Sequence, residues 1–280
     1  MAVWSAWSAA TCGSKSNKTM ILLFDIGNTH THLGLANSRR VVQQLDIPTL
    51  QWSSAAAARR VDAWVGNVRL DGVALCSVVP RVTPAVRSFV QRRWHLACLQ
   101  LTLKTLVEIG IDYPEPSSIG QDRLANAVAV KHHYGAPAVV VDFGTAVTFD
   151  VVNRAGNYAG GIIAPGLSAM TDYLHEKTAL LPAIQIREIR TVVGKNTRDA
   201  MLIGAVHGYR GLIRELLREL KLELRSPRLP VVATGGYAGL IAAKLPEITA
   251  VEPLLTLEGL RLCREGNVKR KTQNVMRTDQ

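Results

Sequence analysis

Two segments of the chain place an aspartate, one further residue and a glycine directly after an apolar run. The run 21–24 leads into Asp25-Ile-Gly-Asn-Thr, and the run 139–141 leads into Asp142-Phe-Gly-Thr. A glycine turn exposes backbone N–H groups that suit phosphate oxygens. An aspartate at the preceding strand end can hold Mg²⁺, which takes one or two carboxylates in addition to phosphates. Two such turns that face each other would grip one nucleotide polyphosphate from both sides.

A single Asp-x-Gly is more simply a hairpin turn. Here, however, both copies lie between an apolar strand and a second strand that begins near a threonine, and they are about one small domain apart. This match favours a duplicated β-turn-β unit and predicts two similar halves.

A third glycine turn, Thr234-Gly-Gly, follows the apolar run 229–233 and precedes a helical pattern. This placement suits a ribose or phosphate at a helix N-terminus, although a plain strand-to-helix loop is the alternative. The segment at Gly194-Lys195 does not fit a P-loop, and no G-x-G-x-x-G occurs, so P-loop and dinucleotide-binding proteins are disfavoured.

A proline-rich loop leads from Tyr113 into Gly120-Gln-Asp-Arg, ahead of a helical pattern that ends at Tyr134. Asp122 suits a helix N-cap, which is a common structural use of aspartate. Beside a phosphate site, the same carboxylate could accept a proton from an alcohol during its phosphorylation. Arg123 could then bind a carboxylate or amide oxygen of the acceptor.

The elements that position these residues alternate between short β-rich runs and longer helical patterns, which predicts an α/β protein with mixed sheets. The predicted strands are 20–24, 32–36, 41–47, 73–79, 97–103, 138–141, 146–152, 158–163 and 230–233. The predicted helices are 53–65, 84–94, 123–134, 167–177 and 197–222.

The composition is that of a globular protein, with 280 residues, 48% apolar residues and 20% charged residues. No apolar run reaches 18 residues, so no transmembrane helix is expected. The four cysteines are far apart and form no C-x-x-C, which favours neither a disulfide framework nor a zinc site and fits a reducing cytosol.

The net charge of +11 invites comparison with nucleic-acid-binding proteins. Residues 1–20 carry +2 and residues 261–280 carry +4, so only +5 falls on the remaining 240 residues. We therefore interpret the excess as basic ends, and we expect nucleic acid not to be a partner. The predicted organisation is a disordered or artefactual extension at 1–19, similar halves at 20–135 and 136–263, and a disordered basic tail at 264–280.

Six motifs in this order resemble the type III pantothenate kinases, the Bvg accessory factor-like branch of the actin/hexokinase/Hsp70-like kinase superfamily. They are Asp25–Thr29, Gly120–Arg123, Asp142–Thr148, Gly160–Gly166, Gly194–Thr197 and Thr234–Gly236. The resemblance implies two similar actin-like (ribonuclease H-like) halves, with mixed sheets flanked by helices, that face each other across a cleft. It also implies ATP-dependent phosphorylation of pantothenate to 4'-phosphopantothenate, the first step of coenzyme A biosynthesis, by a cytoplasmic homodimer that does not bind membranes.

The resemblance further implies roles for individual residues. Asp122 falls on the catalytic base, Asp25 on a position near Mg²⁺, and Asp142 on a ligand of a monovalent cation, K⁺ or NH₄⁺. The ATP-binding positions fall on Asp25, Ile26, Gly27, Asn28, Thr29, His30, Thr31, His32 and Thr145. The pantothenate-binding positions fall on Tyr113, Gly120, Gln121, Asp122 and Arg123, with Thr197 reaching in from the partner subunit of a shared active site.

Two alternatives stay open at this point. One is a non-catalytic regulator of gene expression of the Bvg accessory factor kind, against which the complete set of Asp25, Asp122, Arg123 and Asp142 argues. The other is a different enzyme of the superfamily, such as a sugar or acetate kinase or a polyphosphate phosphatase. Gln121 departs from the small residue that is frequent at its position in the family.

Overall fold

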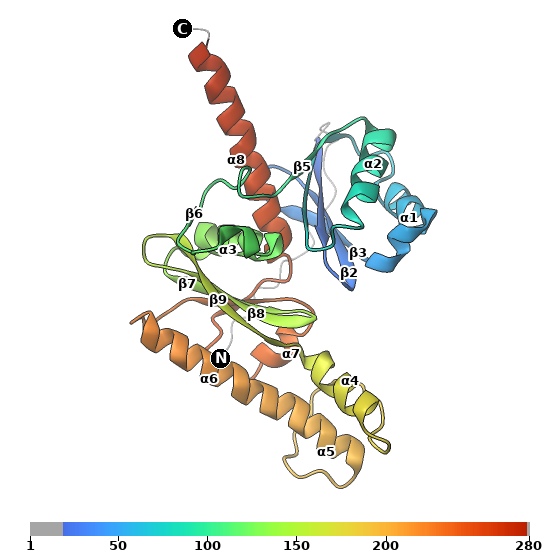
Figure 1. Ribbon diagram of the computed structural model, residues 1–280, viewed down its shortest axis with the longest axis vertical. Coiled ribbons are helices and arrows are strands. Elements are labelled where there is room, and N and C mark those ends of the chain that lie inside the picture. Colours follow the sequence, from blue (N-terminus) through green and yellow to red (C-terminus); the bar gives the residue numbers. More distant parts are fainter. Residues whose placement is uncertain (1–18, 279–280) are drawn as a thin grey trace, which may run out of the picture.

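The structure, a computed structural model, describes residues 19–278 and contains two mixed β-sheets. The first sheet has the strand order β3-β2-β1-β4-β5, and the second has the order β11-β10-β7-β8-β9-β6 (Figure 1). The strands are β1 Met20–Ile26, β2 His30–Ala36, β3 Val41–Pro48, β4 Leu70–Ser77, β5 Cys98–Gln100, β6 Gly110–Ile111, β7 Ala138–Phe143, β8 Ala146–Val152, β9 Asn157–Pro165, β10 Val231–Thr234 and β11 Ala250–Val251. The α-helices are α1 Ala55–Val65, α2 Thr83–Trp94, α3 Gln121–Tyr134, α4 Leu167–Lys177, α5 Thr197–Ile203, α6 Tyr209–Glu223, α7 Ala238–Ala242 and α8 Leu255–Thr278, with 3₁₀ turns at Thr49–Ser53 and Pro116–Ser118.

The second sheet repeats the first. Strands β7 to β11 have the order and directions of β1 to β5, and β6 is added beside β9. In both sheets, three antiparallel strands are followed by a parallel pairing, β1 with β4 and β7 with β10. The predicted α/β fold with two similar halves is therefore confirmed, and the two Asp-x-Gly turns occupy equivalent positions in it.

Helices α3 and α8 lie between the two sheets. One continuous apolar core joins side chains of β1 and β4, both helices, and β7, β8 and β10. The two helices approach closely at Gly259, where a Cβ atom would collide with the carbonyl oxygen of Ala125. Side chains 124–130 of α3 are all buried, because the helix is enclosed on most sides and its residues there are mostly small and apolar.

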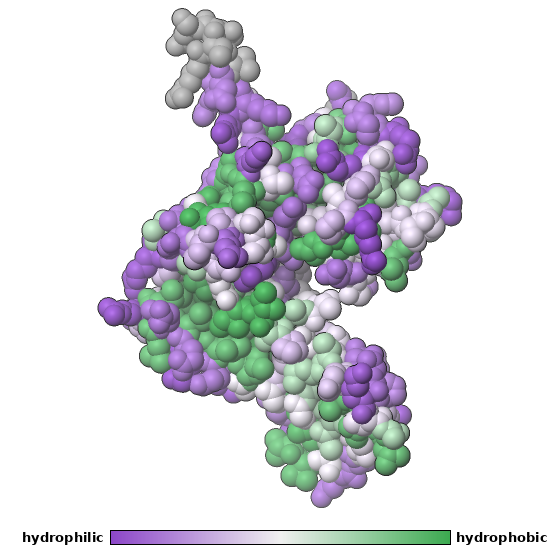
Figure 2. All heavy atoms as spheres, in the orientation of Figure 1, coloured by the Kyte–Doolittle hydropathy of each residue, from purple (hydrophilic) through white to green (hydrophobic). Residues whose placement is uncertain are grey.

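The outer faces of the sheets are covered by other helices. Helices α1 and α2 pack on the first sheet, and α6 and α7 pack on the second (Figure 1). Helix α1 begins after Ser54, whose hydroxyl accepts a hydrogen bond from the backbone N–H of Ala56. In the space-filling view the surface is hollowed between the first half and the region of α4 and α5 (Figure 2).

Two predicted segments differ from the structure. The single helix predicted at 197–222 contains a π turn at Gly204–Gly208, so α5 and α6 are joined by one wider turn. The disordered tail predicted at 264–280 is wrong over the described part, because α8 continues to Thr278. There, Arg264 binds Asp71, while Glu265 pairs with Arg261 and Lys269 along the helix, so these charges support the helix.

Apart from Thr19, the predicted extension at 1–19 lies outside the described residues. Over residues 19–278, no helix is both long and apolar enough to cross a membrane. The boundary predicted between the halves, at 135/136, stays a prediction.

Candidate active site

The two Asp-x-Gly turns meet in space. The hydroxyl groups of Thr29 and Thr145 are 3.0 Å apart and hydrogen-bonded, although they belong to different sheets. The first turn is held in shape by Thr49, whose hydroxyl donates to the carbonyl of Gly27 at 2.7 Å and whose N–H donates to the carbonyl of Thr29 at 2.9 Å. The two glycine turns therefore lie next to each other, as the prediction of two facing turns requires.

Asp25 ends β1 at the base of the first turn. The thiol of Cys76, on the neighbouring strand β4, donates to Asp25 Oδ1 at 3.3 Å. Burial raises the pKa of Asp25 to about 7, and the negative charges of Asp122 and Asp142 add to the effect. A carboxylate in this position gains most from a bound cation, which would stabilise its charged form.

Asp142 occupies the equivalent position at the end of β7. Burial raises its pKa to about 6, and the side-chain amide of Asn126, 3.2 Å from Asp142 Oδ2, acts in the opposite direction. Asn126 has no exposed surface, and its own carbonyl oxygen accepts a hydrogen bond from the Thr256 hydroxyl at 2.8 Å. The two helices between the sheets thus orient the Asp142 carboxylate.

Asp122 lies in the first turn of α3, two residues after the N-cap. The predicted N-cap role is wrong, because Gly120 is the N-cap and makes no side-chain capping bond. Asp122 Oδ1 instead accepts from the backbone N–H of Arg123 at 2.8 Å. Burial raises the pKa of Asp122, despite the opposing hydrogen bond and charge of Arg123. A carboxyl with a raised pKa beside a phosphate site is suited to accept a proton.

Arg123 is held by a buried carboxylate. Its Nε is 2.6 Å from Oδ1 of Asp150, which has no exposed surface, and its Nη2 donates to the carbonyl of Phe149 at 3.2 Å. Tyr158 donates to the same Asp150 oxygen at 3.4 Å. Asp150 therefore fixes the direction of the guanidinium.

Tyr113 packs against Tyr158, which belongs to the group of residues around Arg123. Its ring packs edge-on to Tyr158 at a centroid distance of 6.2 Å. The glycine pair in β9 makes room: a Cβ on Gly160, at φ +109°, would lie 3.3 Å from the Tyr113 ring, and one on Gly161 would collide with the carbonyl of Phe149. The Gly160–Gly166 motif therefore has a packing role around Tyr113 and Arg123.

Gln121 connects the start of α3 to the first sheet. Its side-chain oxygen accepts from the backbone N–H of Ser77, at the end of β4, at 3.0 Å. A cavity of about 470 Å³ lies beside it, lined in part by Ser77, Thr83 and Gln100. The observed contact of Gln121 is thus with the first sheet.

The third glycine turn, at Gly235 and Gly236, lies directly against Asp142. Gly235 has φ +88°, and a Cβ there would lie 2.5 Å from Asp142 Oδ1 and 2.7 Å from the backbone of Phe143. The following residues form α7, so the predicted strand-turn-helix arrangement is confirmed.

The remaining predicted residues are divided between the first hairpin and a distant arm. Ile26 and Thr31 are buried, with Thr31 hydrogen-bonded to Thr49, whereas Asn28 and His30 are exposed in the turn. His32 Nδ1 lies 2.8 Å from Asp46 Oδ1. Thr197 is exposed at the start of α5, on the arm formed by α4 and α5, and is not brought to the other site residues within the chain (Figure 1).

Sequence reasoning missed Asp150, Asn126 and Cys76, all of which contact site residues. Asp150 carries a weak signal, because it is an acidic residue inside an otherwise apolar strand. The contacts of Asn126 and Cys76 depend on neighbouring helices and strands, which no local spacing encodes.

The residues present fit the cations that the sequence analysis expects. Asp25 offers Mg²⁺ one carboxylate beside turns that suit phosphates, which would supply further oxygen ligands. Asp142 offers an oriented carboxylate next to two glycine turns. Within residues 19–278, no group of three or more His, Cys, Asp or Glu side chains could hold a metal ion.

A duplicated mixed sheet whose two glycine turns meet beside a buried carboxylate is the arrangement expected from the resemblance to kinases of the actin/hexokinase/Hsp70-like superfamily. Residues 21–219 match the family model of the type III pantothenate kinases. The chain is 46% identical over 242 residues to a type III pantothenate kinase of Akkermansia muciniphila, covering 86% of this chain and 96% of that protein. It is 42% identical over 256 residues to that of Methylacidiphilum infernorum, covering 91% and 92%. The chain therefore belongs to the type III pantothenate kinase family.

Among solved structures, the ethanolamine utilization protein EutJ from Carboxydothermus hydrogenoformans is similar with a TM-score of 0.49 and 15% identity. The similarity covers 86% of this chain and 88% of that one.

Proposed function

We propose that the chain transfers the γ-phosphoryl group of ATP to the primary hydroxyl of pantothenate, which yields 4'-phosphopantothenate and starts coenzyme A biosynthesis. The observation that carries this proposal is the position of Asp122 and Arg123 on consecutive residues of α3. Beyond the effect of burial, the negative charge of Asp122 raises the pKa of both Asp25 and Asp142, and Arg123 is held beside it by Asp150. One residue is suited to activate an alcohol, and the other to bind the carboxylate that this alcohol substrate carries.

Phosphoryl transfer needs little covalent participation by the protein, so positioning and charge neutralisation dominate catalysis. The N–H groups of the turns that begin at Asp25 and Asp142 would bind the phosphates of ATP. Asp122 would orient the attacking hydroxyl and accept its proton as the new O–P bond forms and ADP leaves. Arg123, fixed by Asp150, would hold the pantothenate carboxylate, with Tyr113 beside it.

Two cations complete the proposal. Mg²⁺, held by Asp25 and by the nucleotide, would neutralise phosphate charge. A monovalent cation, K⁺ or NH₄⁺, held by Asp142, would add positive charge beside the second Asp-x-Gly turn. The raised pKa values of Asp25 and Asp142 support these assignments, because a bound cation would offset the cost of burying their charges.

We also propose that two chains form a homodimer with a shared active site, in which Thr197 of the partner subunit completes the pantothenate pocket. The arm that carries Thr197 exposes large apolar side chains at Tyr173, Leu180, Val192 and Val193. Several large apolar side chains exposed on one arm favour an interface there. The cytoplasmic location stays a prediction.

The experiment that tests the activity is an ADP-release assay with ATP and pantothenate, carried out with and without K⁺ and with NH₄⁺ as a substitute. We expect ADP release that requires pantothenate and increases when either monovalent cation is added. No pantothenate-dependent ADP release at any K⁺ concentration would contradict the proposal. Salt-sensitive DNA binding without kinase activity would instead favour the regulatory alternative.

A further inference from the structure

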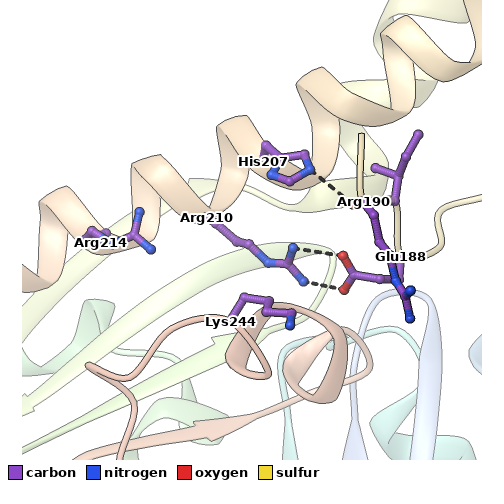
Figure 3. A pocket seen from close by; sticks show the side chains of 7 residues that line it. Glu188, Arg190, His207, Arg210, Arg214 and Lys244 are labelled. Carbon is purple, nitrogen blue, oxygen red and sulfur yellow. Dashed lines mark hydrogen bonds and ion pairs between the residues drawn. The ribbon is translucent and has the colours of Figure 1, made fainter. Parts of the chain in front are cut away.

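A second polar pocket lies in the second half, between the segment at 188–190, the start of α6 and the end of α7. Its volume is about 330 Å³ (Figure 3). Its charged and polar lining residues are Glu188, Arg190, His207, Arg210, Arg214 and Lys244. None of them is among the residues placed in the active site above, so the kinase reaction leaves this pocket unexplained.

One arginine is built into the wall of the pocket. Arg210 is only 4% exposed, and its Nη1 and Nη2 atoms donate to the two oxygens of Glu188 at 3.1 and 2.7 Å. Nη2 also donates to the carbonyl of Leu240 in α7 at 2.6 Å. Its Nε is buried and has no hydrogen-bond partner among residues 19–278. A guanidinium fixed in this way differs from a mobile surface arginine, because its orientation is determined before any ligand binds.

The charges around Arg210 do not cancel. Glu188 neutralises Arg210, and Glu247, just outside the pocket, pairs with Arg214 at 3.0 Å. Arg190 and Lys244 are exposed and form no ion pair with another described residue of the chain. Figure 3 shows the side chains of Arg190, Arg210 and Lys244 gathered around the Glu188 carboxylate. Because basic side chains outnumber the two glutamates, the pocket keeps a positive net charge, and Lys244 adds to the hydrogen bond of Arg210 in lowering the pKa of Glu188.

His207 adds a further polar group. It lies one helical turn before Arg210, and its Nε2 is 3.1 Å from the carbonyl oxygen of Ile189, so Nε2 carries the proton and donates. Nδ1 is left for a ligand or for water. The carboxylate of Glu188 already occupies the guanidinium fork, as an anionic ligand would.

We propose that this pocket is a second anion site that binds a small phosphate-bearing molecule, in contact with Arg190, Lys244 and the edge of the Arg210–Glu188 pair. Arginine and lysine around a fixed guanidinium suit phosphate oxygens. A space of about 330 Å³ suits a phosphate ester of modest size. Glu188 acts as an internal competitor, because its negative charge opposes the incoming anion.

The test is calorimetric titration of the full-length protein with inorganic phosphate and, separately, with glycerol phosphate, at constant ionic strength set with chloride. Phosphate binding at the active site also contributes heat, so the comparison is between variants. We expect the double variant R190A/K244A to lose about 10- to 100-fold in affinity at the second site, the scale of charge-assisted hydrogen bonds. We expect E188Q to bind several-fold more tightly, because the competing charge is removed while Gln can still hydrogen-bond to Arg210.

The matched control is R59A/K104A, which removes one arginine and one lysine from exposed positions elsewhere. We expect it to bind phosphate as the wild-type protein does. All variants should keep the wild-type circular dichroism and pantothenate-dependent ADP release. Equal affinities in R190A/K244A and the wild type, or equal losses in the two double variants, would overturn the proposal. Stronger binding of glycerol phosphate than of inorganic phosphate would identify an ester as the ligand, and the reverse would identify the free anion.

Discussion

The hydroxyl of Thr29 lies 3.0 Å from the hydroxyl of Thr145, and this hydrogen bond joins the phosphate turns of the two halves. Thr29 lies two residues after the glycine of the first turn and Thr145 directly follows the glycine of the second, so the contact joins the corresponding turns of a duplicated fold. Both residues are exposed, so the bond itself contributes little to stability. Under the proposed function, this contact shows that the two turns are close enough for one polyphosphate to reach both.

The first prediction concerns this pair. T29V and T145V should each raise the KM for ATP about tenfold, because a hydroxyl near the phosphates is replaced by a methyl group. The free energy of unfolding should change by less than about 1 kcal/mol. Steady-state kinetics of both single variants and the double variant measure the coupling between the turns. Wild-type KM values in both single variants would show that neither hydroxyl contacts the nucleotide.

The second prediction concerns Asp122, the proposed catalytic base. D122N should lower kcat by about 10²- to 10⁴-fold and leave the KM for pantothenate nearly unchanged, because the amide cannot accept the proton. The matched control is D62N, which removes an exposed carboxylate paired with Arg93. Turnover of D122N within twofold of wild type would mean that Asp122 only accepts the backbone hydrogen bond of α3.

The third prediction concerns the residue that holds Arg123. D150N should raise the KM for pantothenate about tenfold, because an amide orients a guanidinium less firmly than a carboxylate does. D150A should in addition lower the free energy of unfolding by about 3–5 kcal/mol, because Arg123 would lose its partner in a largely buried setting. Urea unfolding and substrate kinetics separate the two effects. A normal KM in D150N would show that Asp150 is only a structural partner.

The fourth prediction compares alanine substitutions at the neighbouring residues Gly235 and Gly236. G235A should weaken ATP binding and lower the free energy of unfolding by about 1–3 kcal/mol, because Gly235 has a positive φ and its Cβ would press on Asp142. G236A is the control, since a Cβ there meets no atom within 4 Å. Nucleotide titration and thermal unfolding of both variants test this. Equal behaviour of the two variants would argue against a tight approach at Gly235.

The fifth prediction concerns pH. The folded-state pKa values of Asp25, about 7, and Asp142, about 6, lie above the ordinary value of 3.8. The unfolded chain therefore loses these protons first as pH rises, and the free energy of unfolding should fall between about pH 4 and pH 7. D142N should reduce this fall and be more stable than wild type at pH 8, as measured by urea unfolding without ligands. A steeper fall in D142N than in wild type would contradict the assignment.

The sequence by itself determined the segments that carry the chemistry. Most strands and helices follow from local apolar periodicity, although α8, β6 and β11 are not predicted in this way. The duplication is visible because both turns have an Asp-x-Gly after the same kind of strand. The family could be predicted for the same reason, since its motifs are short and contiguous. Three local predictions differ from the structure: Gly120 and not Asp122 is the N-cap of α3, a π turn interrupts the helix predicted at 197–222, and α8 continues through the described part of the predicted disordered tail.

Only the tertiary structure decided how these segments meet. The contact of Thr29 with Thr145, the support of Arg123 by Asp150 and the hold of Asn126 on Asp142 all join different elements. Such contacts depend on how the two sheets pack around α3 and α8, and local sequence does not encode that packing because any one strand or helix can bury its apolar face in several ways. The same packing places Arg210, Arg190 and Lys244 around one pocket, although their spacing in the chain shows no pattern.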